Sequence, residues 1–203
     1  MKPEVIAENL LDIGAIHLRP DDPFTWASGI KSPIYCDNRK TLAYPQLRKQ
    51  LATSLASLVK SKIPEVEVIS ATATAGIPHG AWVAQELNLP MSYVRSKAKA
   101  HGMGSAIEGA PAQGKQIALI EDLISTGGSS FDALSKLRNE GGNADHIFAL
   151  FSYGTRRSTE LFAANQVIST TLLDAETLIQ VAIQKQVVTS SQAQEVLSFL
   201  KEL

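Results

Sequence analysis

The sequence predicts an α/β protein with a central parallel sheet covered by helices. Two observations support this class. Short apolar runs that suit buried strands alternate with longer amphipathic stretches that suit helices, and Gly or Pro marks many of the boundaries between them. At 203 residues, the chain is long enough for one well-cored domain with a small elaboration. We find no repeat, low-complexity tract or linker, so we expect a single domain over residues 1–203.

Two helices and a short aromatic segment are expected before the central strands. Residues 3–16 begin with Pro3, which suits the first turn of a helix, and their apolar residues recur on one face. Pro45 opens a second stretch with leucines at helical spacing. Between them, the segment FTWASGIKSPIYCDNR is interrupted by a glycine and a proline. We interpret it as an irregular hairpin or cover rather than core sheet.

From residue 66 onward, predicted strands and helices alternate. The predicted strands cover residues 66–70, 91–94, 117–120, 145–151 and 167–172. The predicted helices cover residues 78–87, about 129–140, 175–186 and 191–200. In a parallel sheet of this kind, ligands bind at the carboxyl ends of the strands, so the connections after the strands are the first place to look for chemistry.

Charge and cysteine content restrict the class of partner. The net charge is −1, from 19 basic and 20 acidic side chains, so no global field attracts nucleic acid or a membrane and any anion site must be local. The single cysteine, Cys36, rules out a disulfide within the chain and fits a reducing compartment. The N-terminus lacks the pattern of a signal peptide, and no apolar run is long enough to span a bilayer. We expect a soluble, cytoplasmic protein that binds neither nucleic acid nor membrane.

The most informative stretch is QIALIEDLISTGGSS, residues 116–130. An apolar run suited to a doubly buried strand is followed by Glu121 and Asp122, and then by the small residues 125–129. Such residues let the backbone curl tightly and present successive N–H groups, and a predicted helix follows. Backbone amides, hydroxyls and a helix N-terminus together favour a phosphate dianion.

The two acids restrict the chemical class of the ligand further. They would repel a bare phosphate, so we expect them to hold ribose hydroxyls, with a divalent cation as a second possibility. The predicted ligand is therefore a ribose 5-phosphate. The alternative is an ordinary strand–turn–helix with a polar turn. Neither a Walker A loop nor a GxGxxG fingerprint is present.

A long segment without apolar periodicity, residues 95–114, separates two predicted strands. Arg95, Lys97, Lys99 and His101 recur at every second residue, so an extended backbone would project all four to one side. Glycines should make the segment mobile. We interpret it as a lid that lays cations over a diphosphate and excludes water, and the alternative is a solvated basic loop.

The stretch 116–130 resembles the phosphoribosyl diphosphate (PRPP) signature of the type I phosphoribosyltransferases, which is an apolar strand, two acids and a Thr-Gly-Gly-Ser loop. The Tyr-Val-Arg-x-Lys-x-Lys-x-His-Gly segment before it and the FTWASGIKSPIYCDNR segment are similar to those of the orotate phosphoribosyltransferase family. This resemblance spans about residues 20–160. It implies a type I phosphoribosyltransferase-like fold with a small N-terminal hood, at about residues 20–40, and a long mobile lid loop, residues 95–114.

The family resemblance also implies an activity. Its members transfer the 5-phosphoribosyl group from PRPP to orotate, giving orotidine 5′-monophosphate and diphosphate, in de novo pyrimidine (UMP) biosynthesis. The reaction uses Mg²⁺, bound mainly through PRPP. The active unit is a homodimer in which the lid reaches the neighbouring subunit. No pair of His or Cys in this chain has metal-ligand spacing, so no protein metal site is expected.

By position, the resemblance assigns three groups of residues. The PRPP-binding group is Arg95, Lys97, Lys99, His101, Glu121, Asp122, Leu123, Ile124, Ser125, Thr126, Gly127, Gly128 and Ser129. The catalytic group is Lys99, His101, Glu121 and Asp122, with the first two acting on the diphosphate and the acids favouring positive charge on the ribose. The orotate-binding group is Ser125, Arg156, Lys31 and Tyr35.

Two other functions fit parts of the pattern. Another base-specific phosphoribosyltransferase, using a purine or uracil, would keep the acid pair and the loop but would not be expected to share the lid and hood segments. A non-catalytic PRPP-sensing regulator would usually add a nucleic-acid-binding element or a basic face, and the sequence suggests neither. Base-dependent turnover and a nucleic-acid binding test would separate these alternatives.

Overall fold

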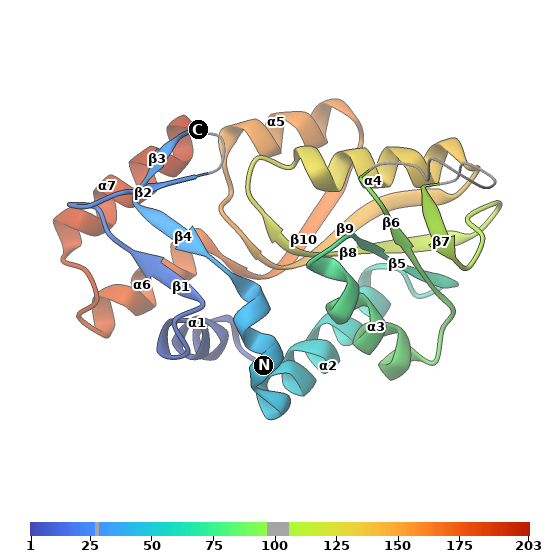
Figure 1. Cartoon of the computed structure of the whole chain (residues 1–203), viewed down its shortest axis with the longest axis horizontal. Coiled ribbons are helices and arrows are strands. Elements are labelled where there is room, and N and C mark those ends of the chain that lie inside the picture. The colour runs from blue at the N-terminus through green and yellow to red at the C-terminus, as the bar shows by residue number, and fades with distance from the viewer. Residues whose placement is uncertain (27–28, 97–105) are drawn as a thin grey trace.

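The computed structural model describes residues 1–26, 29–96 and 106–203 (Figure 1). Six strands form the central sheet in the order β10-β9-β8-β5-β6-β7. They are β5 (Val68–Thr72), β6 (Met91–Val94), β7 (Ile107–Gly109), β8 (Gln116–Ile124), β9 (Asn143–Ser152) and β10 (Ile168–Asp174). Neighbouring strands are parallel except for β6 and β7, which are antiparallel. The predicted α/β class with a parallel sheet is confirmed.

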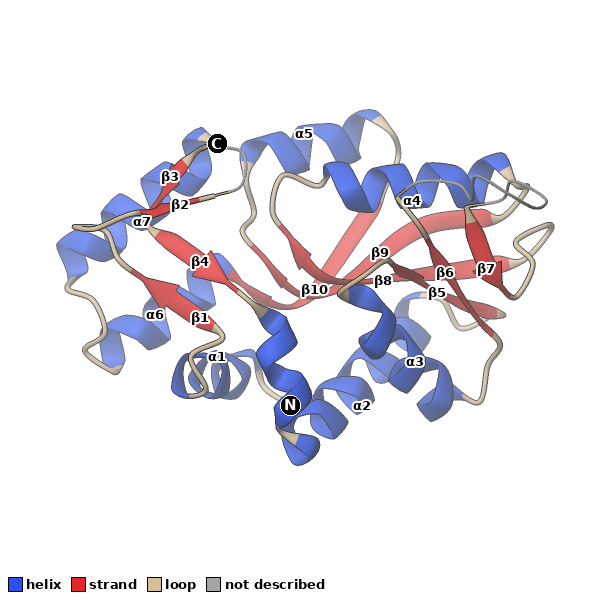
Figure 2. Ribbon diagram, in the orientation of Figure 1, coloured by secondary structure: helices blue, strands red, loops and turns tan. Residues whose placement is uncertain are grey.

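Helices cover both faces of this sheet (Figure 2). One face carries α2 (Pro45–Lys62) and α3 (Gly76–Leu87), and the opposite face carries α4 (Gly128–Asn139) and α5 (Arg156–Ala164). At the β10 edge, α1 (Pro3–Asp12) packs against α6 (Ala175–Gln184), which in turn contacts α7 (Ser190–Glu202). Within the described ranges, no helix combines the length and the hydropathy needed to cross a membrane.

The central strands β5, β8 and β9 are largely apolar because both of their faces are buried. Along β8, Ile117 and Leu119 belong to the hydrophobic cluster beneath α4, whereas Ala118 and Ile120 belong to the cluster on the α2 and α3 face. This alternation is the two-residue period of a strand. A sheet covered on both sides therefore needs continuous apolar runs, which is the pattern that the sequence shows.

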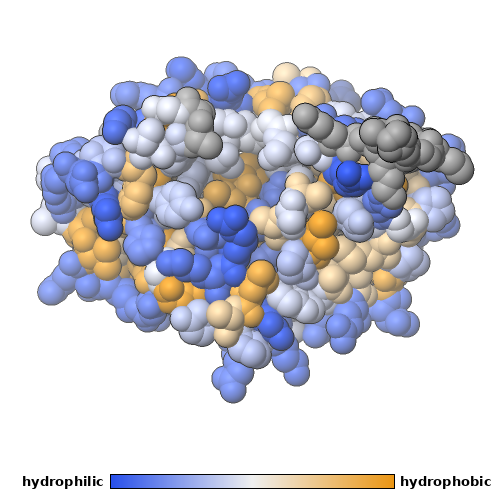
Figure 3. Space-filling view, viewed as in Figure 1, coloured by the Kyte–Doolittle hydropathy of each residue, from blue (hydrophilic) through white to orange (hydrophobic). Residues whose placement is uncertain are grey.

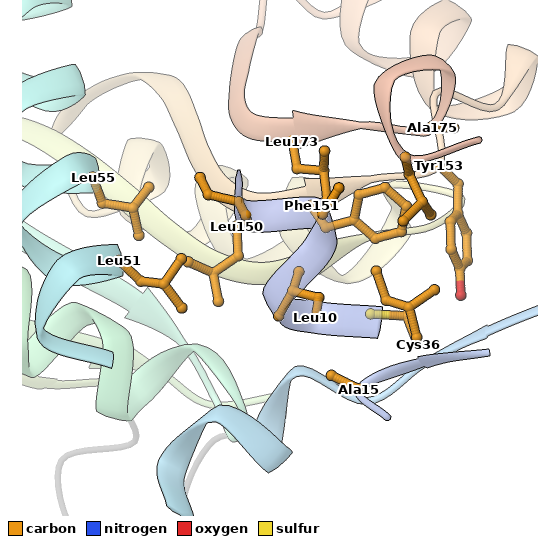
Figure 4. Packing of buried hydrophobic residues seen from close by; sticks show 14 of the residues in the cluster. Leu10, Ala15, Cys36, Leu51, Leu55, Leu150, Phe151, Tyr153, Leu173 and Ala175 are labelled. Carbon is orange, nitrogen blue, oxygen red and sulfur yellow. The ribbon is translucent and has the colours of Figure 1, made fainter. Parts of the chain in front are cut away.

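The larger hydrophobic cluster joins the N-terminal region to the sheet. Leu10 of α1 lies in it beside Phe151 of β9, and Cys36 and Tyr153 extend it toward the hood (Figure 4). In the same view, Leu51 of α2 points toward β9. The hood therefore shares its core with the sheet.

The hood consists of two small antiparallel pairs and a short 3₁₀ helix. β1 (Ile16–Leu18) pairs with β4 (Ile34–Cys36), β2 (Phe24–Thr25) pairs with β3 (Lys31–Ser32), and η1 (Asn38–Ala43) follows. Trp26 stacks on Tyr153 with ring centroids 5.5 Å apart, and its indole N–H donates to the carbonyl of Ile34 at 3.2 Å. The predicted irregular hairpin is confirmed, and an aromatic contact connects it to the chain after β9.

Four differences from the sequence predictions go beyond shifts of about two residues at the ends of elements. The first helix ends at Asp12, because Gly14 adopts a positive φ of 63° and the chain turns into β1. β8 runs on to Ile124, so the acid pair lies inside the strand rather than after it. α5 was not predicted, although Thr155 caps it by accepting a hydrogen bond from the N–H of Ser158.

The fourth difference concerns the predicted lid loop, residues 95–114. Ile107–Gly109 form the edge strand β7, which pairs with β6. Gly109 has a φ of 103°, and a Cβ there would lie 2.5 Å from the carbonyl oxygen of Met91. The close approach of β6 therefore requires glycine, and the C-terminal part of the predicted loop is sheet.

Candidate active site

The first acid of the pair, Glu121, is turned into the protein. Its side chain is only 4% exposed. Its Oε1 accepts a hydrogen bond from the N–H of Asp122 at 3.0 Å, and its Oε2 accepts one from the hydroxyl of Ser130 on α4, also at 3.0 Å. Burial, followed by the negative charge of Asp122, raises the pKa of Glu121 to about 8. Glu121 therefore connects the strand to the helix that follows it.

The second acid, Asp122, is half-buried, and its backbone is in contact with the hood. Its carbonyl oxygen accepts a hydrogen bond from the Nδ2 of Asn38 at 2.7 Å. After burial, the negative charge of its carboxylate is the next cause of the raised pKa of Glu121. The two acids thus meet at the end of β8 but differ in exposure, and Asp122 is the one better placed to meet a ligand from solvent.

The loop after β8 leaves the start of α4 open. Gly127 has a φ of 78°, and a Cβ on it would lie 2.9 Å from the ring of Phe162, so only glycine fits. No side chain caps this helix, and the first residues, Gly128 and Ser129, are exposed. The first N–H groups of a helix have no partner within it, so this end is suited to bind an anion.

The loop is supported from behind by the connection between β9 and α5. Thr155 donates its hydroxyl to the carbonyl of Ser125 at 2.8 Å, and the N–H of Tyr153 donates to the carbonyl of Ile124 at 2.9 Å. Arg156 follows Thr155 directly and is exposed at the first position of α5. The predicted orotate-binding residues Ser125 and Arg156 are therefore brought close together.

Leu123 and Ile124, predicted to bind PRPP, have side chains directed into the hydrophobic core. Ile124 is 1% exposed. The side chain of Ile124 cannot reach a ligand, so only its backbone remains available for binding, whereas Leu123 is partly buried. On the hood, Lys31 is exposed on β3, and the ring of Tyr35 packs on that of Phe24 with centroids 5.5 Å apart.

Arg95 lies just after the carboxyl end of β6, and its backbone is held on both sides. Its N–H donates to the carbonyl of Ala106 at 2.9 Å, and its guanidinium lies 3.5 Å from the carboxylate of Glu108. Lys136 of α4 donates to the carbonyls of Arg95 at 3.1 Å and Ser96 at 2.9 Å. The other predicted cations of this segment, Lys97, Lys99 and His101, lie outside the described residues.

Four residues near the site were not identified from the sequence. Asn38, Ser130 and Lys136 act through contacts with residues distant in the chain, which no local pattern reveals. His79 of α3 is 2% exposed, and burial lowers its pKa to about 4 against the opposing charge of Asp122. His79 is therefore neutral near pH 7, as its burial requires.

The surface over this region is hollowed near the centre of the space-filling view, with hydrophilic residues along its lower margin (Figure 3). In the described part of the chain, no group of three or more His, Cys, Asp or Glu side chains is arranged to hold a metal ion. A cation here would need oxygen atoms from a ligand in addition to the carboxylate of Asp122.

The fold and the site together define a type I phosphoribosyltransferase: a parallel sheet, an acid pair at a strand end and an uncapped helix behind a Ser-Thr-Gly-Gly turn. The orotate phosphoribosyltransferase of Enterococcus faecalis is 54% identical over 179 residues, which cover 88% of this chain and 85% of that protein. The chain belongs to the orotate phosphoribosyltransferase family. The resemblance recognised in the sequence is thereby confirmed.

Solved structures of orotate phosphoribosyltransferases share the fold of this chain. The orotate phosphoribosyltransferase of Aeropyrum pernix superimposes with a TM-score of 0.76 at 27% identity, over 86% of this chain and 96% of that one. An orotate phosphoribosyltransferase of Mycobacterium tuberculosis, solved with PRPP, shares the fold with a TM-score of 0.65 at 17% identity, over 87% of this chain and 98% of that one. No protein-family model matches the chain.

Proposed function

We propose that this protein transfers the 5-phosphoribosyl group of PRPP to orotate, giving orotidine 5′-monophosphate and diphosphate in de novo pyrimidine (UMP) biosynthesis. The observation that carries the proposal is the end of β8, where an acid pair precedes an uncapped helix N-terminus, in a chain 54% identical to an orotate phosphoribosyltransferase. The same features support assignment as a pentosyltransferase, and the single cysteine fits the reducing conditions of the cytoplasm.

The ribose 5-phosphate of PRPP fits the β8 end. The backbone N–H groups from Thr126 to Ser129, with the adjacent hydroxyls, would accept the 5-phosphate at the start of α4. The carboxylate of Asp122 would accept hydrogen bonds from the ribose hydroxyls. Glu121 would act mainly by anchoring Asp122 and Ser130, because both of its oxygens already accept hydrogen bonds within the protein.

The chemistry is displacement at the anomeric carbon. Positive charge develops on the ribose as the bond to diphosphate breaks, and the ring nitrogen of orotate attacks, so no enzyme nucleophile is needed. Asp122 would stabilise the developing cation electrostatically. Orotate would lie between the hood and the loop, with Ser125 and Arg156 on one side and Lys31 and Tyr35 on the other.

The departing diphosphate needs positive charge. We assign this role to Arg95, Lys97, Lys99 and His101, acting on the neighbouring subunit of a homodimer. Lys99 and His101 are the proposed proton donors, and Lys99 could serve by charge alone. A charge-assisted hydrogen bond to phosphate is worth about 1.5–3 kcal/mol, so three or four of them would contribute strongly to leaving-group stabilisation.

Mg²⁺ would be bound mainly through oxygens of PRPP and water, because the described residues form no cage of protein ligands for it. When bound, it would neutralise charge on the diphosphate. The available protein oxygens are those of Asp122, whose half-buried carboxylate suits one contact with a hydrated cation.

The ultraviolet absorbance of orotate tests the proposal directly. We expect the orotate band to disappear only when protein, PRPP and Mg²⁺ are all present, and the rate to fall in Lys99→Ala and His101→Ala variants. Turnover of adenine, hypoxanthine or uracil in place of orotate would keep the class of enzyme and overturn the substrate. PRPP binding without turnover of any base would instead indicate a regulator.

A further inference from the structure

One hydrogen bond joins the hood to the acid pair across 84 residues of sequence. The Nδ2 of Asn38 donates to the carbonyl oxygen of Asp122 at 2.7 Å, and Asn38 is only 1% exposed. Its own backbone is fixed by η1: Asp37 accepts from the N–H of Arg39 at 3.2 Å, and the hydroxyl of Thr41 donates to the carbonyl of Asn38 at 2.6 Å. The amide is therefore presented from a rigid turn.

The carbonyl of Asp122 needs this donor because β8 extends beyond the end of its neighbour β5. The last residue of β5 that pairs with β8 is Ala71, opposite Ile120, so β5 offers no backbone N–H level with Asp122. The N–H of Asp122 is likewise bonded to a side chain, that of Glu121, at 3.0 Å. Both backbone polar groups of Asp122 are thus held by side chains, one of which belongs to the hood.

We propose that Asn38 is a positioning residue, which holds Asp122, and the ribose that it binds, in register with the base-binding side of the hood. This inference rests on the proposed function. Tyr35, on β4, lies three positions before Asn38 in the chain. Arg39 directly follows Asn38, and its guanidinium lies 2.6 Å from the carboxylate of Asp37. Moving Asn38 relative to β8 would shift the base relative to the anomeric carbon.

The geometry requires a hydrogen-bond donor at this position. A carbonyl oxygen only accepts hydrogen bonds, so the group facing it must be a donor of the right length. Alanine and serine are too short, leucine has no donor, and an ionised aspartate would set one acceptor against another. Because the reacting atoms must be aligned within a few tenths of an ångström, a misplacement of about 1 Å can cost roughly a hundredfold in rate.

The test compares Asn38→Ala with a matched control, Asn165→Ala. The Nδ2 of Asn165 makes the same kind of bond, to the carbonyl of Leu161 at 2.8 Å, at the far end of α5. We expect kcat to fall about tenfold or more in Asn38→Ala and to stay within about twofold of wild type in Asn165→Ala. Thermal unfolding of both variants separates a positioning role from a loss of folding.

An Asn38→Asp variant gives a readout that a purely structural role would not. When protonated, the new side chain can donate to the carbonyl of Asp122, and when ionised it cannot. Burial at this position should raise the pKa of the new carboxyl toward neutral pH. We therefore expect the ratio of variant to wild-type kcat to rise as the pH is lowered from about 8.5 to about 6. The ratio corrects for the other titratable or charged groups around the turn, which are Cys36, Asp37, Arg39, His79, Glu121 and Asp122.

Two outcomes would overturn the inference. One is a folded Asn38→Ala variant whose kcat lies within about twofold of wild type, and the other is an equal loss in the two alanine variants. Failure of the proposed function would be recognised separately, because wild-type protein would then not consume orotate. In that case, calorimetric titration with PRPP decides: weaker binding in Asn38→Ala alone supports the positioning role, and equal binding in all three proteins contradicts it.

Discussion

The β8 end and the β6 end, which in the proposed homodimer serve the PRPP sites of two neighbouring subunits, are held by different means. At the end of β8, the proposed anion-binding groups are backbone N–H groups, and a glycine with positive φ and a threonine bonded to the carbonyl of Ser125 fix their positions. At the end of β6, the proposed anion-binding group is the side chain of Arg95, which has an ion pair of 3.5 Å with Glu108. Among the strands that the structure describes, only β7 lies beyond β6 in the sheet.

The difference shows which part of the ligand each end can serve. Backbone N–H groups are fixed in position by the fold. Such groups suit the 5-phosphate, which stays on the product. A side chain at a sheet edge can reorient, which suits a diphosphate that must be held in the transition state and then released. The following variants test this division, from the largest expected effect to the smallest.

Asp122→Asn removes the charge that the account assigns to the ribose. We expect kcat to fall more than about tenfold, or more than about 1.4 kcal/mol of transition-state stabilisation. The fold should remain, because the hydrogen bonds of this residue to Asn38 and to the Oε1 of Glu121 use its backbone. Steady-state kinetics and thermal unfolding provide the two measurements. An unchanged kcat in the folded variant would remove this acid from the mechanism.

Gly127→Ala perturbs the backbone site. The residue combines a φ of 78° with a Cβ position 2.9 Å from Phe162, so the loop must shift. We expect the KM for PRPP to rise about tenfold and the free energy of unfolding to fall by about 1–3 kcal/mol. Gly114→Ala is the control, since Gly114 also has a positive φ, 71°, but nothing lies within 4 Å of its Cβ position. An equal rise in KM in both variants would argue against the loop as the phosphate site.

Lys136→Met removes contacts that hold the backbone at the end of β6 and leaves the side chain of Arg95 unchanged. It removes the two hydrogen bonds to the carbonyls of Arg95 and Ser96. We expect the KM for PRPP to rise about threefold to fivefold, with a smaller change for orotate. Lys115→Met is the control, because the Nζ of Lys115 also makes a partly buried contact, 2.9 Å from Glu67, at the start of β8. If both variants behave alike, Lys136 has no specific role at Arg95.

Glu121→Gln should change the pH dependence of stability. The pKa of Glu121 is about 8 in the folded protein, against 4.5 as its ordinary value, so the folded state binds the extra proton between these values. Wild-type stability should therefore fall as the pH rises from about 4.5 to about 8. Glutamine cannot ionise, so the variant should gain on wild type across this window, by an amount on the order of 1 kcal/mol. Denaturant unfolding at several pH values measures it, and a constant difference would show that Glu121 is ionised in the native state.

The sequence predicted the sheet and the turn before α4 well, because both are encoded locally. A doubly buried strand needs a continuous apolar run, and the loop from Ser125 to Ser129 is continuous in the chain. The acid pair interrupted the apolar pattern, so the strand was predicted to end too early. A carboxyl such as that of Glu121 can be buried within a strand only when it is protonated or hydrogen-bonded, and no sequence pattern reports this.

The supporting contacts could not be predicted, because they join distant segments. Asn38 meets Asp122 across 84 residues, and Lys136 meets Arg95 across 41 residues. Each is a single polar residue whose sequence neighbours explain it adequately as part of a turn or a helix surface. Only the three-dimensional placement of these residues beside the two strand ends identifies them as parts of the site.

A crystal structure of the protein with PRPP and Mg²⁺ tests the central claim most directly. The account predicts that the 5-phosphate accepts hydrogen bonds from the backbone N–H groups between Thr126 and Ser129, with the ribose hydroxyls on the carboxylate of Asp122. A ribose phosphate bound elsewhere, or one that leaves Asp122 without contact to the ribose, would contradict it.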